Sequence, residues 1–310
     1  MKLEILDRLA ELPHRFRSTP RLQEWTWPLA RHEIDAVAIT WPTRHEWPRT
    51  AGIVETLKHG LGNLGVLTSA ETDQTLKRMV MLHCQVRGRE HIVALDMSDD
   101  HHFVNADALE LSSLYLKGEF RREGYRDPKI VPAGYPVTGN DYYKYYRVYR
   151  DAGSQRRQID VVGRFGYTFQ EEIRRKAVSL LSTAQGIDFR GTGGKVRYSR
   201  FIREVAASRL CLHMPGNGPF THRVAEFLGA GSCMVSIPFA TDMHVPLQPG
   251  VHYVQVAEDL SDLVEKCRYY LEHDDEREAI AHAGRDYFDR YLHRDQLAAY
   301  YVRTILERIH

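Results

Sequence analysis

The sequence predicts an α/β protein with two domains, and three observations support this fold class. The chain has 310 residues, and a single domain usually takes about 150. In its second half, short β-branched runs alternate with amphipathic segments of helical length. Strands that alternate with such helices form parallel βαβ units, because parallel strands need crossover connections. We therefore expect one domain over residues 1–150 and another over residues 151–310.

The elements of the second half are readable in order along the chain. Strands are predicted at residues 158–163, 187–189, 210–214 and 233–237. Thr168 and Glu171 form a capping-box pattern ahead of an apolar helical face that runs from Phe169 to Ala184. Further helices are predicted over residues 199–208, 219–228, 260–271, 275–291 and 295–309. The alternation ends in helices, as expected of a doubly wound domain.

The first half gives weaker signals. Strands are predicted at residues 34–40, 91–97, 114–120 and 129–132, and helices at residues 52–59 and 75–85. Residues 141–157 are rich in tyrosine and charge and are the predicted linker. The five tyrosines of this segment could stack on sugars or bases, or simply pack the linker against the domains, and we favour packing.

Composition restricts the classes of partner. Lys and Arg number 42 against 41 Asp and Glu, so the net charge of +1 gives no general attraction to nucleic acid or anionic membrane. The four cysteines are scattered, which indicates neither a disulfide framework nor a zinc site and favours the reducing cytoplasm. No stretch predicts a membrane span. The first 16 residues predict an amphipathic helix, so a peripheral membrane contact stays open.

The segment 215–231, PGNGPFTHRVAEFLGAG, is the strongest candidate site. Gly216, Asn217 and Gly218 suit a tight turn with left-handed backbone before a helix, whose free amides and dipole would bind phosphate. Arg223 and Glu226 lie three residues apart on this helix. Arg223 has the planar fork that suits a diphosphate, and Glu226 could accept hydrogen bonds from ribose hydroxyls. The alternative for these two residues is a solvated ion pair on a surface helix.

Residues 199–301 resemble the C-terminal domain of GT-B glycosyltransferases, on the runs RVAEFLGAGSCMVS, GVHYVQVAEDLSDLVEKCRYYL and DDEREAIAHAGRDYFDRYLHRDQLAAYYV. The likeness is to the bacterial CgeB-like group-1 enzymes and, more distantly, to the exostosin family. It implies two Rossmann-like domains that face a cleft, with a final helix that crosses back to the N-terminal domain. It also implies that Arg223 and Glu226 belong to a nucleotide-sugar pocket. Arg164, directly after the first strand of that domain, is then a second phosphate candidate.

Two features leave roles open on the donor side. Many retaining GT-B enzymes carry a second glutamate upstream, where this chain has Pro219 and Phe220, so the stereochemical outcome is not determined. His213 lies at the carboxyl end of a predicted strand, where ligands collect in open α/β sheets. It could donate to the phosphate or sugar of the donor, or be a satisfied core histidine.

Residues 96–102, DMSDDHH, form the second candidate site because they follow a predicted strand. Asp96, Asp99 or Asp100 could be the general base that deprotonates an acceptor hydroxyl. The same segment could hold a divalent cation or be a solvated acidic loop. We predict no metal and no cofactor, because helix amides and arginines can stabilise a leaving diphosphate without them.

These observations together predict a glycosyltransferase that moves a sugar from a nucleotide diphosphate sugar to an acceptor hydroxyl. The alternatives are a nucleotide-sugar epimerase and a non-catalytic nucleotide- or glycan-binding module. A transferase acting on DNA bases is less favoured, because it would need a local basic groove.

Overall fold

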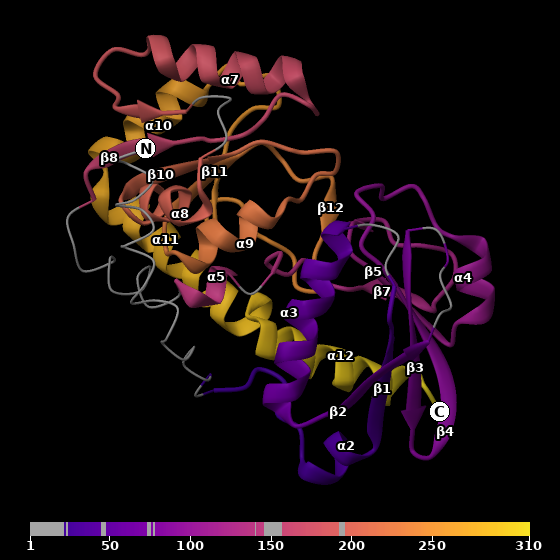
Figure 1. Cartoon of the computed structure of the whole chain (residues 1–310). Coiled ribbons are helices and arrows are strands. Elements are labelled where there is room, and N and C mark those ends of the chain that lie inside the picture. The colour runs from indigo at the N-terminus through magenta and orange to yellow at the C-terminus, as the bar shows by residue number, and fades with distance from the viewer. Residues whose placement is uncertain are drawn as a thin grey trace.

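The computed structural model contains one large β-sheet in each half of the chain, and it confirms the predicted α/β fold class (Figure 1). The structure describes residues 22, 24–44, 48–72, 76, 78–139, 141–145, 157–191 and 196–310. The predicted N-terminal amphipathic helix and the domain boundary at residues 150 and 151 lie outside these residues. Within the described chain, no helix is both long and apolar enough to cross a membrane.

The N-terminal half folds around a six-stranded mixed sheet with the strand order β2-β1-β3-β4-β5-β7. β3 runs antiparallel to both of its neighbours, and the other adjacent strands are parallel. The strands are β1 (Val37–Pro42), β2 (Leu67–Thr72), β3 (Met79–Val86), β4 (Arg89–Asp96), β5 (Leu114–Lys117) and β7 (Ile130–Pro132). The helices are α2 (Arg31–Asp35), α3 (Pro48–Leu64), α4 (Ala106–Leu111) and α5 (Asp141–Lys144).

The helix predicted at residues 75–85 is wrong, because this segment forms β3. Its side chains are buried almost continuously, so it lacks the alternation that marks a half-buried strand. The informative signal is the next two residues. Arg87 and Gly88 have φ values of 51° and 80°, the left-handed geometry of a two-residue hairpin turn between β3 and β4.

The C-terminal half folds around a parallel sheet with the order β13-β11-β10-β8-β9. In chain order this is the 2-1-3-4-5 arrangement of a doubly wound domain, in which the topology switches between β8 and β10. The strands are β8 (Ile159–Val162), β9 (Phe189–Arg190), β10 (Ser208–His213), β11 (Cys233–Ser236) and β13 (Val254–Gln255). The helices are α7 (Glu171–Thr183), α8 (Tyr198–Ala206), α9 (His222–Gly229), α10 (Leu263–Glu272) and α11 (Asp274–Tyr287).

Two predicted helix starts need correction. α7 begins after Gln170, which has a left-handed backbone with φ of 50° and makes no side-chain cap, so Thr168 and Glu171 form no capping box. α9 begins at His222 rather than at residue 219. Both segments that precede these helices line the pocket described below.

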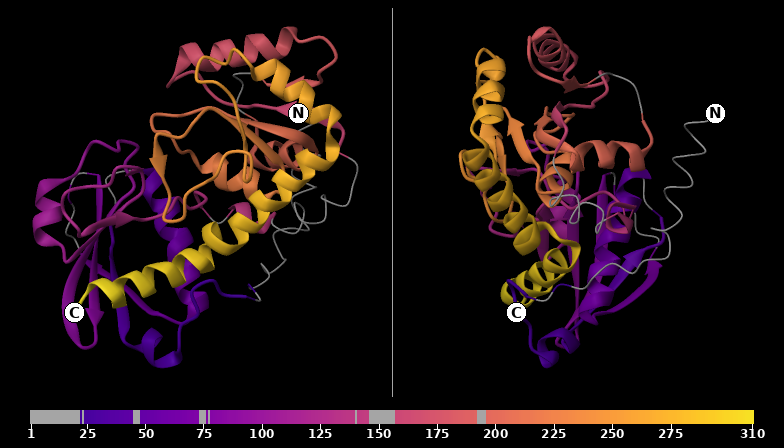
Figure 2. Two further views of the ribbon diagram at one scale, coloured as in Figure 1. Left: turned by 180° about the vertical axis from the view of Figure 1, so that it is seen from behind. Right: turned by 90° about the vertical axis from the view of Figure 1, so that its left-hand side faces the viewer.

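The last helix crosses from the C-terminal half back to the N-terminal half, as predicted. After α11, a π-helical turn η1 (Phe288–Leu292) leads into α12 (Arg294–Arg308), which packs against α3 (Figure 2). The Tyr300 hydroxyl donates to the Pro132 carbonyl at 2.6 Å, and Arg303 forms an ion pair with Glu33 at 2.9 Å. One apolar core therefore continues through both halves of the molecule.

A second connection between the halves is a short two-stranded ribbon. β6 (Phe120–Arg121), which follows β5, pairs with β12 (Thr241–Asp242), which follows β11. Arg122 extends this contact by donating to the Phe239 carbonyl at 2.8 Å. In the predicted linker, Tyr142 and Tyr143 are buried in the shared core, so these two tyrosines pack rather than face a ligand.

Candidate functional site

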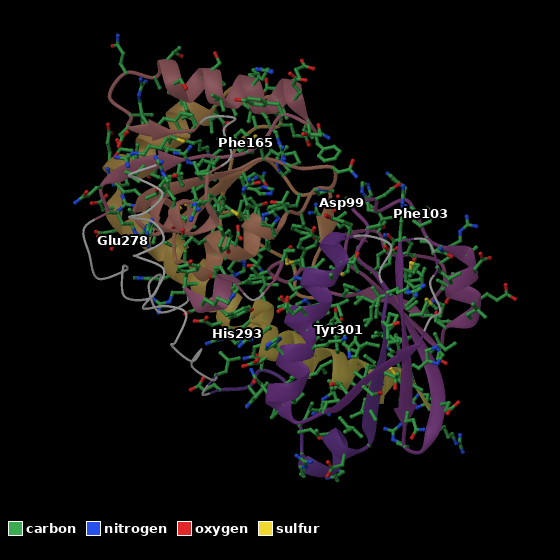
Figure 3. All side chains as sticks on the ribbon, in the orientation of Figure 1. Asp99, Phe103, Phe165, Glu278, His293 and Tyr301 are labelled. Carbon is green, nitrogen blue, oxygen red and sulfur yellow. The ribbon has the colours of Figure 1, made fainter. Side chains whose placement is uncertain are left out.

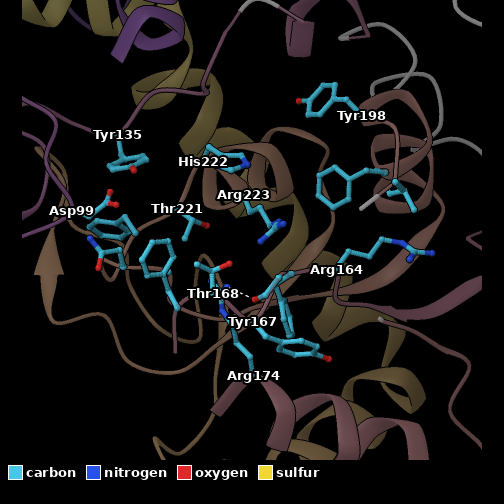
Figure 4. Close-up of a pocket in the computed structure, with 18 residues that line it drawn as sticks. Asp99, Tyr135, Arg164, Tyr167, Thr168, Arg174, Tyr198, Thr221, His222 and Arg223 are labelled. Carbon is cyan, nitrogen blue, oxygen red and sulfur yellow. Dashed lines mark hydrogen bonds between the residues drawn. The ribbon is translucent and has the colours of Figure 1, made fainter. Parts of the chain in front are cut away.

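A cleft of about 750 Å³ opens at the switch point between β8 and β10 (Figure 4). Its walls are the segments that follow these two strands, residues 164–169 and 216–223, together with parts of α7 and α8. Asp99 and Tyr135 complete it from the N-terminal half. Ligands of open α/β sheets bind at the carboxyl ends of the strands at such a switch point, so topology alone makes this the expected site.

Arg174 of α7 is a buried cation in the wall of this cleft that sequence reasoning missed. Its Nε donates to the Pro215 carbonyl at 2.9 Å and its Nη1 to the Gly166 carbonyl at 2.6 Å, so the side chain is anchored to both strand-end segments. No carboxylate of the described residues forms an ion pair with it. Burial and the nearby charge of Arg223 lower its pKa to about 10, so it stays charged at neutral pH. An anion could compensate this desolvated charge.

A signal for Arg174 does exist in the sequence. The buried residues of α7 are Arg174, Ala177 and Leu181, which share one face at spacings of three and four. An arginine on an otherwise apolar helical stripe needs a buried partner, which marks it as a site candidate.

Arg223 and Thr221 bring further polar atoms to the same wall, at the start of α9. The Nε of Arg223 and the hydroxyl of Thr221 are buried and have no hydrogen-bond partner among the described residues. Burial lowers the pKa of Arg223, while Glu226 opposes this shift. Figure 4 shows the guanidinium of Arg223 directed into the cleft, between Thr221 and Arg164. The structure thus places Arg223 and Arg174 in the wall of one cleft.

Glu226 is buried, which removes the solvated surface pair as its explanation. Its Oε1 accepts a hydrogen bond from the Tyr198 hydroxyl at 2.8 Å, whereas its Oε2 is buried without a partner among the described residues. Burial raises the pKa of Glu226 to about 7, against the opposing effects of Tyr198 and Arg223. A hydroxyl donor from a ligand would satisfy Oε2 and favour the charged form.

His213 lies at the end of β10 with its ring buried. Its Nδ1 is 3.0 Å from the Ser236 hydroxyl, which itself donates to the Ile237 carbonyl. Nδ1 is therefore the protonated nitrogen, and Nε2, which has no partner among the described residues, is an acceptor. Burial, with the charges of Arg223, Arg174 and His222, lowers its pKa to about 3. Geometry thus favours acceptance from a hydroxyl over the predicted donation to phosphate.

The glycine-rich turn is used differently from the prediction. Gly216 and Gly218 do not have left-handed backbone, since both lie outside the positive-φ glycines of the chain. A Cβ on Gly218 would come within 2.6 Å of the Asp99 carbonyl oxygen, and one on Gly216 would lie 3.2 Å from Thr221. Close packing, above all against the N-terminal half, is the reason for glycine at Gly218. Gly216 and Asn217 line the cleft.

Arg164 lines the cleft as predicted, but it also has a protein partner. Its Nη2 donates to Glu204 of α8 at 2.9 Å, with a second contact from Nε to the same carboxylate. Arg200 binds this carboxylate as well, at 3.1 Å. The ion pair with Glu204 holds the Arg164 side chain at the edge of the cleft and partly neutralises its charge.

The three predicted bases, Asp96, Asp99 and Asp100, lie in different surroundings in the structure. Asp96 is fully buried at the end of β4, where its Oδ2 accepts from Lys117 at 2.9 Å and from the Tyr115 hydroxyl at 2.7 Å. This ion pair makes Asp96 a structural residue and not a base.

Asp100 is exposed and faces its own loop. Although partial burial raises its pKa, hydrogen bonds from the backbone amides of His102 and Phe103 outweigh this and give a net lowering. Asp99 alone of the three lies in the wall of the cleft, beside Tyr135 (Figure 4) and at the junction of the two halves (Figure 3). Among the described residues, no cluster of three or more His, Cys, Asp or Glu side chains has the arrangement of a metal site.

Comparisons with known proteins agree with this geometry. The family model described as glycosyl transferase-like matches residues 153–306. Protein O-glucosyltransferase 2 of Danio rerio is 44% identical over 55 residues, 18% of this chain and 11% of that protein. Protein O-glucosyltransferase 3 of Rattus norvegicus is 35% identical over 68 residues, 22% of this chain and 13% of that protein. The chain therefore matches only a small part of either relative.

Among solved structures, two crystal structures of HepE from Anabaena overlay loosely, each with 15% identity. The complex with UDP-glucose gives a TM-score of 0.41 over 68% of this chain and 72% of that one. The complex with UDP and glucose gives 0.43 over 69% and 70%. The strand order and the family model define the fold more sharply than these overlays. Residues 153–306, with the cleft at their switch point, form a domain of the glycosyl transferase-like family.

Proposed function

We propose that the protein is a glycosyltransferase that transfers a sugar from a nucleotide diphosphate sugar to an acceptor hydroxyl. The observation that carries this proposal is a set of buried polar atoms without partners among the described residues, gathered on neighbouring elements of one domain. These atoms are Thr221 Oγ1, Arg223 Nε, Glu226 Oε2 and His213 Nε2. Leaving such groups unpaired costs about 1–3 kcal/mol each. Thr221 and Arg223 line the cleft, so a ligand there that offers anionic oxygens would compensate these two directly, whereas Glu226 and His213 lie outside its lining and would need ligand hydroxyls that reach past it.

Each part of such a donor can be matched to residues of this domain. Its diphosphate would bind Arg174, Arg223, Thr221 and the first amides of α9, where two cations and a helix N-terminus coincide. Its ribose would donate to Glu226, which Tyr198 holds in place. Charge accumulates on the diphosphate as the glycosidic bond breaks. Arginines that are already in position stabilise that charge without reorganising, and this is their catalytic contribution.

The acceptor would enter from the N-terminal half, where Asp99 and Tyr135 line the cleft. Of the three predicted bases, Asp99 fits this role best, because it lines the cleft beside Tyr135 (Figure 4). The aromatic side chains of Tyr135 and Phe220 offer apolar faces on which a sugar ring can pack. In the transfer step, Asp99 would take the proton of the acceptor hydroxyl and the acceptor oxygen would attack the anomeric carbon. The diphosphate would leave as its bond to that carbon breaks.

A donor screen tests this proposal. Wild-type protein and Arg223→Ala would be melted with a panel of nucleoside diphosphates and nucleotide diphosphate sugars that covers several bases and sugars. At least one sugar nucleotide should raise the wild-type Tm, because a ligand that binds only the folded state stabilises it, and the variant should lose that increase. Release of nucleoside diphosphate with candidate acceptors then tests transfer. A panel without any stabilising nucleotide would contradict the proposal.

A further inference from the structure

A buried carboxyl group lies where the two halves meet, outside the wall of the cleft. Glu119 follows β5 in the N-terminal half, and its side chain is fully buried. Its Oε1 accepts a hydrogen bond from the backbone amide of Phe220 at 3.0 Å, and its Oε2 lies 2.8 Å from the Thr241 hydroxyl. Both partners belong to the C-terminal half. Each oxygen of this side chain therefore bonds across the junction.

The same carboxyl group touches the glycine-rich turn before α9. A Cβ placed on Gly218 would come within 2.7 Å of Glu119 Oε1, as close as it would come to the Asp99 carbonyl. Phe220, whose amide Glu119 binds, stacks on Phe239 with ring centroids 4.7 Å apart. The turn is thus held between the loop of Asp99, the carboxyl of Glu119 and an aromatic side chain of its own domain.

We propose that Glu119 is a positioning residue, which fixes the turn of residues 215–220, and with it the start of α9, against the Asp99 loop of the other half. The structural part of this inference stands on the contacts above, and its catalytic part rests on the proposed transfer reaction. Glu119 would set the distance between the base and the diphosphate wall without touching either substrate. A misplacement of about 1 Å between reacting groups can lower a rate about 10²-fold.

The protonation state of Glu119 fits this role. Burial raises its pKa to about 8, and the charge of Asp99 adds to this, while Thr241, the Phe220 amide and Lys117 oppose it. A neutral carboxyl can still accept from both the Phe220 amide and the Thr241 hydroxyl. The other charged residues on or beside the ribbon are paired: Arg122 with Asp242 at 3.4 Å, and Arg121 with Glu123 at 3.8 Å. Deprotonation would leave a buried charge at the junction, and its desolvation would destabilise this junction.

Hydrogen exchange of the Phe220 amide tests the contact without any need for substrate. We expect Glu119→Ala to accelerate exchange in a peptide covering residues 216–224 by about 10-fold, the effect of losing one hydrogen bond. Glu119→Gln should protect this amide as the wild type does, because its amide side chain offers the same acceptor and donor as a neutral carboxyl. Peptides of α12 should be unchanged. Glu123→Gln, at an exposed position nearby on the chain, is the matched control.

Steady-state kinetics test the positioning role. In Glu119→Ala, kcat should fall about 10²-fold while the affinity for nucleotide stays within about threefold of the wild type, since Glu119 bonds to Phe220 and Thr241 and to none of the residues assigned to the diphosphate. The wild-type rate should also decline as pH rises through about 8, and Glu119→Gln should remove this decline. A role in folding alone would instead lower Tm and change neither the pH profile nor the ratio of kcat to affinity.

Each outcome decides the matter. Wild-type exchange at Phe220 in Glu119→Ala, or an alkaline decline that persists in Glu119→Gln, would overturn the inference. If Glu119→Ala does not fold, Thr241→Val takes its place, because it removes one of the two hydrogen bonds of Glu119 at similar side-chain volume. Unchanged exchange of the Phe220 amide in Thr241→Val would overturn the inference equally. If the wild type transfers no sugar at all, the proposed function fails, and with it the catalytic part of this inference. The exchange measurement still tests the contact itself.

Discussion

The positive charge of Arg223, on α9, acts on the guanidinium of Arg174, on α7, and contributes to its lowered pKa. Neither arginine forms an ion pair with a carboxylate of the described residues, although both are held in the wall of one cleft. Two like charges at such a site repel each other, and an anion bound between them would be attracted by both. The donor side of the proposed reaction depends on this pair.

We expect Arg174→Ala and Arg223→Ala each to weaken nucleoside diphosphate binding by about 1.5–3 kcal/mol, the range for hydrogen bonds to charged groups. Lys176→Ala is the matched control, because Lys176 is an exposed cation on the same helix as Arg174. Titration calorimetry would measure all three variants. Wild-type affinity in a folded Arg223→Ala variant would remove α9 from the binding site.

The affinity for a nucleotide sugar should rise with pH through about 7. Burial raises the pKa of Glu226 to about 7 in the free protein, and ribose hydroxyls donate to its charged form, so binding is linked to loss of a proton. A nucleotide sugar, unlike a free diphosphate, has no phosphate group that titrates in this range. Glu226→Gln should make the affinity independent of pH between about 6 and 8. A slope that persists in this variant would assign the titration to another group.

Asp99→Asn should lower the rate of transfer about 10²- to 10⁴-fold and leave donor binding intact, because a general base acts on the acceptor hydroxyl. Asp100→Asn should transfer at nearly the wild-type rate, since its carboxylate is occupied by the amides of its own loop. Rates measured at saturating donor with both variants make the comparison. Equal rates in the wild type and Asp99→Asn would place the base elsewhere in the N-terminal half.

Asp96→Asn should act on stability instead. Asp96 and Lys117 face each other in register on β4 and β5 with both side chains fully buried. Removing one partner of a buried ion pair leaves an uncompensated charge, which costs about 3–5 kcal/mol. We expect a clearly lower denaturation midpoint in urea. A variant as stable as the wild type would show that the pair contributes little.

Acid should destabilise the protein partly through His213. Its pKa is about 3 when folded and near its usual value when unfolded, so between these values the unfolded chain binds more protons. Stability is therefore lost as pH falls through this window. His213→Asn should reduce the fall in Tm between about pH 6.5 and 4, relative to His282→Asn at an exposed site on α11. Parallel curves for the two variants would contradict a neutral buried His213.

The role of α9 in the candidate site could be predicted from sequence, because the features that indicate it are local. Arg223 and Glu226 lie on one short helix after a glycine-rich turn, so their proximity follows from helical spacing alone. The burial of Glu226 was not predictable, since it depends on Tyr198 of α8 packing across it. The sequence-based expectation of the cytoplasm stays a prediction.

The acceptor side illustrates what sequence cannot give. Asp96, Asp99 and Asp100 are chemically equivalent in the sequence, and only the pairing of β4 with β5 separates a buried ion pair from a residue in the cleft. Glu119 is less predictable still, because all of its partners come from residues about 100 or more positions away. Sequence periodicity indicates which residues share a face of one helix or strand, and a contact between two domains leaves no such pattern in either of them.

The crossing of α12 has a consequence for synthesis on the ribosome. Residues of α12, among them Leu297, Tyr301 and Ile305, complete the core that α3 and the first sheet begin. The strands of the N-terminal sheet lie between residues 37 and 132, whereas one of its covering helices is formed by residues 294–308 and is translated much later. Domains usually fold as they leave the ribosome, N-terminal first. Here the apolar face of the N-terminal half stays uncovered until residues 294–308 arrive, so this half can complete its core only after the C-terminal sheet has been translated.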